Sequence, residues 1–238
     1  MSLRLRGLIV VPLLLLPALR PARAQARYSA GAALIVGQPL GEFGDNVSSG
    51  VGLDGMGTIG LDSRGIISLR AQLGWMQYSR KTESFLVETG FGLAELESET
   101  KSGVLTLGIG PQLMAPEGSV RPYIAGTIGF SRFSTETAIN IPSRSSNTGE
   151  KETLDQQTVS SDFILSLAGA AGIAFHLPAF GRTGAMVDLG ARYHHNGLAS
   201  YVSSDGVQYN GTGTPTILAT TSEADFIVYR IGVIVPIR

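Results

Sequence analysis

The feature of this sequence that most restricts its fold is a strict alternation of apolar residues with small or polar ones. In IISLRAQLGWMQYS (66–79), Ser, Arg, Gln and Gly separate the apolar residues at odd positions, which are Ile67, Leu69, Ala71, Leu73 and Trp75. A period of two is that of a β-strand whose two faces meet different surroundings. No helical period of 3.6 residues stands out from residue 27 onward, so the chain is predicted to be all-β.

The alternating pattern recurs eight times, and the links between the stretches differ in length. Links after the second, fourth and sixth stretches are short, whereas long loops are expected at about 37–46, 81–98, 134–161 and 196–222. An even number of strands with short turns at one end and long loops at the other is typical of outer-membrane barrels. The sequence therefore predicts an eight-stranded antiparallel up-and-down transmembrane β-barrel with four extracellular loops. Strands are expected near 27–36, 47–61, 66–80, 99–114, 120–133, 162–177, 185–195 and 223–237.

The polar face of the strands distinguishes a membrane barrel from a water-soluble one, because both alternate. A solvated face carries many lysines and glutamates. Here only 16% of residues are charged, against about a quarter in soluble domains. Lys81, Lys101 and Lys151 fall in or beside the expected loops. We therefore expect the polar face to line the inside of the barrel.

One strand face changes from charged to apolar within AELESETKSGVLTLGIGPQL (94–113). Its odd positions are charged up to Lys101 and apolar or small from Gly103 to Leu113, a run of 11 residues. A tilted strand needs about 9 to 11 residues to cross a bilayer. Because aromatic rings favour the headgroup zone, Trp75 and Tyr193 are predicted at the outer membrane boundary.

Residues 1–24 have the pattern of a cleaved export signal. Two arginines precede the apolar run LIVVPLLLLPAL, and a small-x-small motif ends at Ala24. The run is too short, and too interrupted by proline, to be a transmembrane helix of about 20 residues. Cleavage is expected after Ala24 or Ala26, which leaves 25–238 as a barrel in the outer membrane of a Gram-negative envelope.

Composition excludes several classes of site. The chain has no cysteine, which removes disulfides, lipid attachment to cysteine and thiolate metal sites. With 18 basic against 19 acidic residues, a nucleic-acid partner is not expected. No cofactor and no metal ion are expected either.

If the apolar face meets lipid, five charged side chains project into the lumen. Buried charges are costly unless they are paired, and the interior of an eight-stranded barrel is only just wide enough for its side chains. We expect these residues to meet in mid-barrel as a structural polar network, in preference to a proton or ion path. They are Asp54, Arg70, Asp188, Arg192 and Arg230.

The stretch RPYIAGTIGFSRF (121–133) resembles the Pro-Tyr-aliphatic-x-x-Gly strand of small outer-membrane barrels of the OmpA and OmpX type. The resemblance in strand order covers residues 27–238. It implies a non-enzymatic envelope protein whose partners are outer-membrane lipid, lipopolysaccharide and the barrel-assembly machinery, with an unidentified surface ligand at the loops. The chain departs from the family at its end, GVIVPIR, where Arg238 replaces the usual terminal aromatic residue.

The stretch RYHHNG (192–197) raises an enzymatic alternative, because it is similar to the His-His-x-Ser-Asn-Gly stretch of PagL-type lipid A deacylases. The serine nucleophile expected two positions after a histidine is missing. Strand parity points His194 inward and His195 outward, and His176 lies near the opposite end of the barrel, so neither joint catalysis nor a metal site is expected. We predict a structural or interfacial role and no catalytic residue. A narrow pore for small solutes is a further alternative that depends on fold analogy alone.

Overall fold

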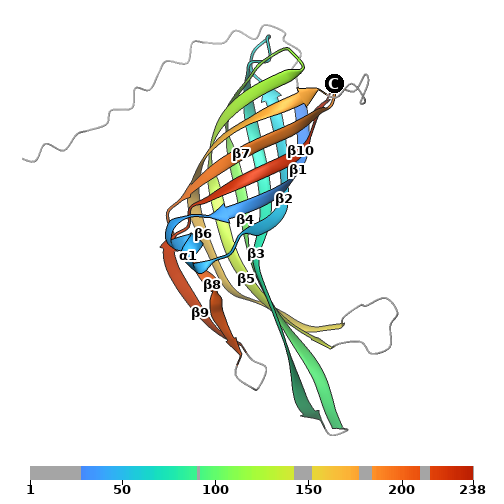
Figure 1. The fold of residues 1–238 in the computed structure, drawn as a ribbon, viewed down its shortest axis with the longest axis vertical. Coiled ribbons are helices and arrows are strands. Elements are labelled where there is room, and N and C mark those ends of the chain that lie inside the picture. The colour runs from blue at the N-terminus through green and yellow to red at the C-terminus, as the bar shows by residue number, and fades with distance from the viewer. Residues whose placement is uncertain (1–27, 90–91, 142–151, 177–183, 210–214, 238) are drawn as a thin grey trace, which may run out of the picture.

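The computed structural model describes residues 28–89, 92–141, 152–176, 184–209 and 215–237, so the predicted signal segment and Arg238 lie outside the described residues. Eight antiparallel strands close into a barrel in the order β1-β10-β7-β6-β5-β4-β3-β2, as Figure 1 shows. The predicted all-β, eight-stranded up-and-down barrel is confirmed. The barrel strands are β1 (Tyr28–Pro39), β2 (Gly50–Gly60), β3 (Ile67–Thr89), β4 (Gly92–Met114), β5 (Val120–Ile141), β6 (Glu152–His176), β7 (Met186–Asn196) and β10 (Phe226–Ile237).

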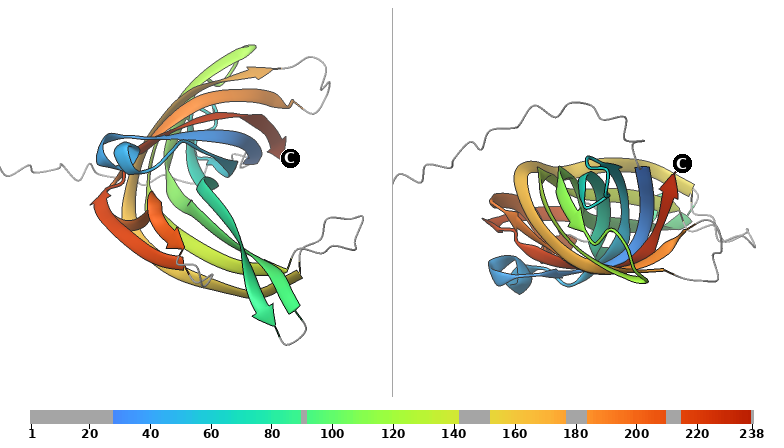
Figure 2. Two further views of the ribbon diagram at one scale, coloured as in Figure 1. Left: turned by 60° about the horizontal axis from the view of Figure 1, so that its bottom comes forward. Right: turned by 90° about the horizontal axis from the view of Figure 1, so that it is seen from above.

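The four strands β3 to β6 are about twice as long as the others, at 22 to 25 residues against 11 or 12. Much of the two stretches expected as loops at 81–98 and 134–161 is therefore strand, which corrects the sequence-based bounds. The backbone hydrogen bonds of a hairpin need no apolar face, so polar residues continue the ladder beyond the apolar band. The hairpins β3–β4 and β5–β6 project beyond one end of the barrel in Figures 1 and 2.

The other two expected loops, 37–46 and 196–222, also contain regular structure. The first includes the end of β1 and a helix, α1 (Gly41–Asn46), which at six residues is too short to show a helical period. The second contains a separate two-stranded sheet of β8 (Leu198–Tyr209) and β9 (Pro215–Glu223). Figure 2 shows α1, β8 and β9 gathered at one mouth of the barrel. No helix in the described ranges is long and apolar enough to cross a membrane.

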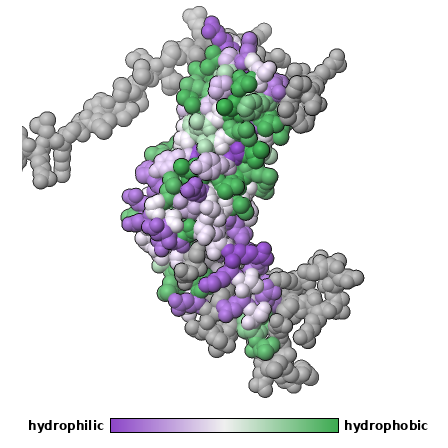
Figure 3. All heavy atoms as spheres, in the orientation of Figure 1, coloured by the Kyte–Doolittle hydropathy of each residue, from purple (hydrophilic) through white to green (hydrophobic). Residues whose placement is uncertain are grey.

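The barrel has an apolar outside and a polar inside. Trp75, Leu107 and Tyr193 are 48%, 56% and 41% exposed on the outer face, whereas the side chains of Arg70 and Asp188 are fully buried inside. In Figure 3 hydrophobic residues cover much of the barrel wall, and hydrophilic residues gather towards the mouth that carries α1, β8 and β9. The wall is therefore suited to an apolar environment. We call the mouth that carries α1 the outer mouth.

Candidate functional site

Four of the five predicted lumen charges form a charged layer across the barrel. Arg192 Nη2 lies 2.6 Å from Asp54 Oδ2, which joins β7 to β2 through the interior. Arg230 Nη2 lies 3.5 Å from Asp54 Oδ1 and 3.1 Å from Asp188 Oδ2. Ala33 of β1 lies between β2 and β10 in the sheet, and its small inward side chain leaves room for these contacts. The layer bridges strands that are far apart in the sequence.

Arg70 joins this layer through a glutamine and not through a carboxylate. Gln72 Oε1 accepts hydrogen bonds from Arg192 Nη1 at 2.9 Å and from Arg70 Nε at 3.2 Å. Arg70 Nη1 donates to Gln112 Oε1 at 2.9 Å, and its guanidinium lies over the Tyr123 ring. The glutamines were not predicted as site residues, because neither residue type nor strand parity distinguishes them from other inward polar residues.

His194 points inward, and the structure brings Ser166 beside it, a serine that the local sequence pattern did not reveal. Arg192 Nε donates to His194 Nε2 at 2.8 Å, and Ser166 Oγ lies 3.2 Å from His194 Nδ1. An arginine always donates, so Nε2 carries no proton and Nδ1–H must donate to the serine oxygen. In this tautomer His194 cannot take a proton from Ser166. The pair is therefore part of the packed interior, where the imidazole also stacks on Phe226.

Between the charged layer and the outer mouth, an aromatic plug closes the barrel. Phe43 of α1 is fully buried and meets the rings of Tyr78, Phe133 and Tyr201 edge-on at centroid distances of 5.7, 5.6 and 4.8 Å. Phe226 lies at 6.5 Å. These five rings, from α1, β3, β5, β8 and β10, define the aromatic plug. It has the composition of a soluble protein core and fills the lumen where the sequence predicted only polar residues.

On the outside of the same mouth, three polar side chains form a rim cluster of Tyr193, His195 and Asp225. Asp225 Oδ2 accepts hydrogen bonds from the Tyr193 hydroxyl and from His195 Nδ1, the latter at 3.0 Å. Asp225 Oδ1 accepts from the Asn196 backbone N–H at 2.8 Å. Asp225 immediately precedes β10, and the pairing of Phe226 with His194 places it here. No local sequence signal linked it to the histidines.

The hydrogen bonds of the rim cluster change how its groups ionise. The hydrogen bond to Asp225 and the negative charge of that carboxylate raise the pKa of His195 above its ordinary value. Burial raises the pKa of Asp225, but the hydrogen bonds from Tyr193 and His195 outweigh it and hold this pKa below its usual range. The cluster is therefore an ion pair over a wider pH range than two isolated groups would be.

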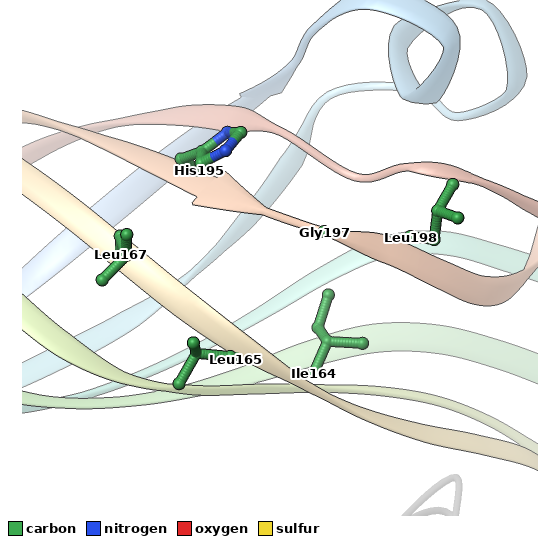
Figure 4. Close-up of a pocket in the computed structure, with 6 residues that line it drawn as sticks. All are labelled: Ile164, Leu165, Leu167, His195, Gly197 and Leu198. Carbon is green, nitrogen blue, oxygen red and sulfur yellow. The ribbon is translucent and has the colours of Figure 1, made fainter. Parts of the chain in front are cut away.

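The His195 ring borders a shallow apolar groove of about 370 Å³, shown in Figure 4. The groove lies between β6 and the junction of β7 with β8, and leucine and isoleucine side chains form most of its walls. Among the described residues, Asp225 is the hydrogen-bond partner of the His195 ring, and no hydroxyl of a serine or threonine reaches it. The groove residues are Ile164, Leu165, Leu167, His195, Gly197 and Leu198.

The remaining predicted positions lie as follows. Trp75 points outward from β3, between Leu53 and Leu105 of the neighbouring strands. His195 points outward as well, so the rings of the two adjacent histidines diverge. His176 ends β6 at the mouth opposite to α1.

Comparison with known proteins gives structural similarity only. No family model matches the chain, and no curated protein sequence matches it. Neisserial surface protein A is 10% identical, with a TM-score of 0.47 over 87% of this chain and 96% of that chain. A major outer membrane protein of Thermus thermophilus is 11% identical, with a TM-score of 0.48 over 90% of this chain and 100% of its own. Ail of Yersinia pestis, solved with a heparin analogue, is 11% identical, with a TM-score of 0.43 over 89% and 99%.

Proposed function

We propose that this protein is an integral outer-membrane barrel with a sealed lumen, which acts without catalysis in envelope structure or in surface contact through its outer hairpins. The observation that carries the proposal is a distribution of polarity opposite to that of a water-soluble protein, with apolar side chains outside and charged ones inside. Leu34, Leu73 and Ile128 are more than half exposed on the wall, at 63%, 52% and 53%, while arginines and aspartates are buried inside. Such a wall is stable in lipid, where a closed barrel satisfies every backbone hydrogen bond.

Two successive obstructions support a sealed lumen. The charged layer fills the middle of the barrel with paired side chains, and the aromatic plug fills the outer mouth. An eight-stranded barrel has an interior just wide enough for side chains. These two obstructions among the described residues support a sealed lumen over the alternative of a narrow pore.

The long hairpins support surface contact. Beyond the apolar band, β4 and β5 are joined by hydroxyl pairs, Ser102 with Thr135 and Thr100 with Thr137, both at 2.9 Å. Glu99 pairs with Lys101 at 3.2 Å and with Arg80. These buried contacts tie the strands together beyond the apolar band. Their charged partners Arg80 and Lys101, with side chains 57% and 47% exposed, are polar groups that a surface partner could reach.

Cell fractionation followed by protease treatment of intact cells tests this proposal. We expect the protein in the outer-membrane fraction, with cleavage confined to the hairpins β3–β4 and β5–β6 and the sheet β8–β9. Purified protein in planar bilayers should show no steady, large conductance. Recovery as a soluble periplasmic protein would refute the membrane assignment, and steady conductance would refute the sealed lumen.

The hydrogen-bonded pair of His195 and Asp225 beside an apolar groove favours a second candidate, lipid A acyl hydrolysis. A histidine oriented by a carboxylate is one half of a hydrolytic site, but a hydroxyl nucleophile within reach of the imidazole is also needed. A mass profile of lipid A from cells with and without the protein decides between the two functions. We expect identical profiles. Loss of an acyl chain that depends on His195 would replace the non-enzymatic proposal.

A further inference from the structure

A second groove, of about 570 Å³, runs along the outer wall below the rim cluster and has glycines in its floor. Gly126 of β5 and Gly169 of β6 are cross-strand partners, and Gly169 also pairs with Tyr193 of β7. We call this the glycine groove. Its apolar walls include Ile109, Ile128 and Leu167, and its upper end reaches Tyr193 and His195.

Close packing does not explain these two glycines. A Cβ atom added at Gly126 or Gly169 would meet no heavy atom within 4 Å. By contrast, a Cβ at Gly52 would lie 1.9 Å from the Trp75 carbonyl oxygen, and one at Gly129 would lie 1.8 Å from the Leu107 carbonyl oxygen. Glycine weakens a strand interior, and it often marks a site where a ligand approaches the backbone. The glycine groove is therefore a space kept open on a surface that faces lipid chains.

Tyr193 also lines an acidic hollow of about 530 Å³, so the glycine groove and this hollow share one residue of their walls. Three carboxylates line this hollow, from Glu42 of α1, Glu223 of β9 and Asp225. Among the described residues, neither Glu42 nor Glu223 forms an ion pair. His195 lies where the two grooves on the wall meet, since it lines both of them. From the wall outward, the chemistry changes from apolar to a histidine and then to carboxylates.

We propose that this surface binds one molecule of an ethanolamine glycerophospholipid. One acyl chain lies in the glycine groove, the phosphate accepts a hydrogen bond from His195, and the primary ammonium donates to the carboxylates of the acidic hollow. The order of acyl chain, phosphate and ammonium in the lipid matches the order of apolar residues, histidine and carboxylates along the surface. Charged hydrogen bonds of this kind are stronger than neutral ones. An anionic headgroup would be repelled by the carboxylates of Glu42 and Glu223, and a choline headgroup has no N–H with which to bind them.

The proposal depends on the membrane location proposed above, and one experiment separates the two. The full mature protein is inserted into phosphatidylcholine vesicles that contain either phosphatidylethanolamine or phosphatidylglycerol. After extraction, native mass spectrometry measures the lipid retained per protein. We expect phosphatidylethanolamine to be retained about tenfold over both other lipids, the ratio that 1.4 kcal/mol gives. Failure to insert would overturn both proposals, whereas insertion with equal retention of the three lipids would overturn only this one.

Three variants test the parts of the site. G169L fills the glycine groove and should abolish the retention. G57L is the matched control, because Gly57 lies on the outer face of β2 with its nearest Cβ neighbour at 3.9 Å, away from the groove. The exposed pair E42Q/E223Q leaves the groove intact and should reduce the preference for ethanolamine over glycerol headgroups about threefold or more, as expected for exposed charge pairs. Equal lipid retention by G169L and G57L would overturn the proposal. If G169L does not fold, an unchanged headgroup preference in E42Q/E223Q would overturn it.

Discussion

Replacing Phe43 with alanine should release the aromatic plug and leave the barrel folded. Burying a phenylalanine contributes about 1.5 to 3 kcal/mol, and the cavity left behind raises the cost of Phe→Ala to about 3 to 5 kcal/mol. Phe43 is fully buried and meets three rings edge-on, so the cost should fall within this range. The lost free energy weakens the docking of α1 and not the barrel, because Phe43 joins this six-residue helix to the barrel mouth.

Amide hydrogen exchange measures this release at two defined bonds. The Leu40 N–H donates to the Asp225 carbonyl at 2.9 Å, and the Gly44 N–H donates to the Leu40 carbonyl at 3.2 Å. A loss of about 3 to 5 kcal/mol corresponds to exchange about 100 to several thousand times faster. The increase in exchange rate has an upper limit, because these amides cannot exchange faster than they would in a helix that is not docked at all. This limit is set by the free energy with which α1 docks in the wild-type protein.

The barrel strands provide the internal control for this experiment. Amides of β1 and β10 should keep their protection in F43A, because the charged layer and the strand ladder are unchanged. F130A makes the same substitution on the outer wall of the barrel, where Phe130 is 55% exposed, and should leave α1 protected. The reasoning would be refuted by exchange at Leu40 and Gly44 that accelerates less than tenfold, or by an equal acceleration in the barrel strands.

Three further predictions concern the interior, the wall and the rim. D54N leaves two buried arginines without their shared carboxylate, which should lower the free energy of unfolding by about 3 to 5 kcal/mol in denaturant titrations; a loss below 1 kcal/mol would contradict the pairing. G52A places a Cβ against a backbone oxygen and should be strongly destabilised, whereas G55A, with its nearest contact at 3.9 Å, should fold normally; equal stability of both would contradict the close approach of β2 and β3. In NMR titrations the pKa of His195 should lie above its ordinary value and return to it in D225N. Stabilisation by this pair should be lost as the pH rises through the raised pKa of His195 or falls through the lowered pKa of Asp225, and an unshifted histidine would disprove the ion pair.

The sequence by itself determined the architecture and the direction of the side chains. Strand side chains alternate with a period of two whatever the strand pairs with, so Trp75 and Leu107 could be assigned outward and Arg192 inward without a structure. The count of alternating stretches and the unequal links then predicted eight strands in a closed barrel. Polar continuations of β3 to β6 were predicted as loops, because hairpins beyond the apolar band pair through their backbones and need no apolar alternation.

Only the tertiary structure decided which side chains meet. Ser166 beside His194, Gln72 between two arginines, and Asp225 beside His195 all depend on the register between strands, and a shift of one residue would exchange the inward and outward faces of a strand. Phe43 enters the outer mouth because α1 folds back over it, and a single buried residue in a short helix leaves no periodic signal. The period of the side-chain pattern is a local property of the chain, whereas register and the docking of a loop are set by contacts between distant residues. Gln72 and Arg192, which are hydrogen-bonded, lie 120 positions apart in the sequence.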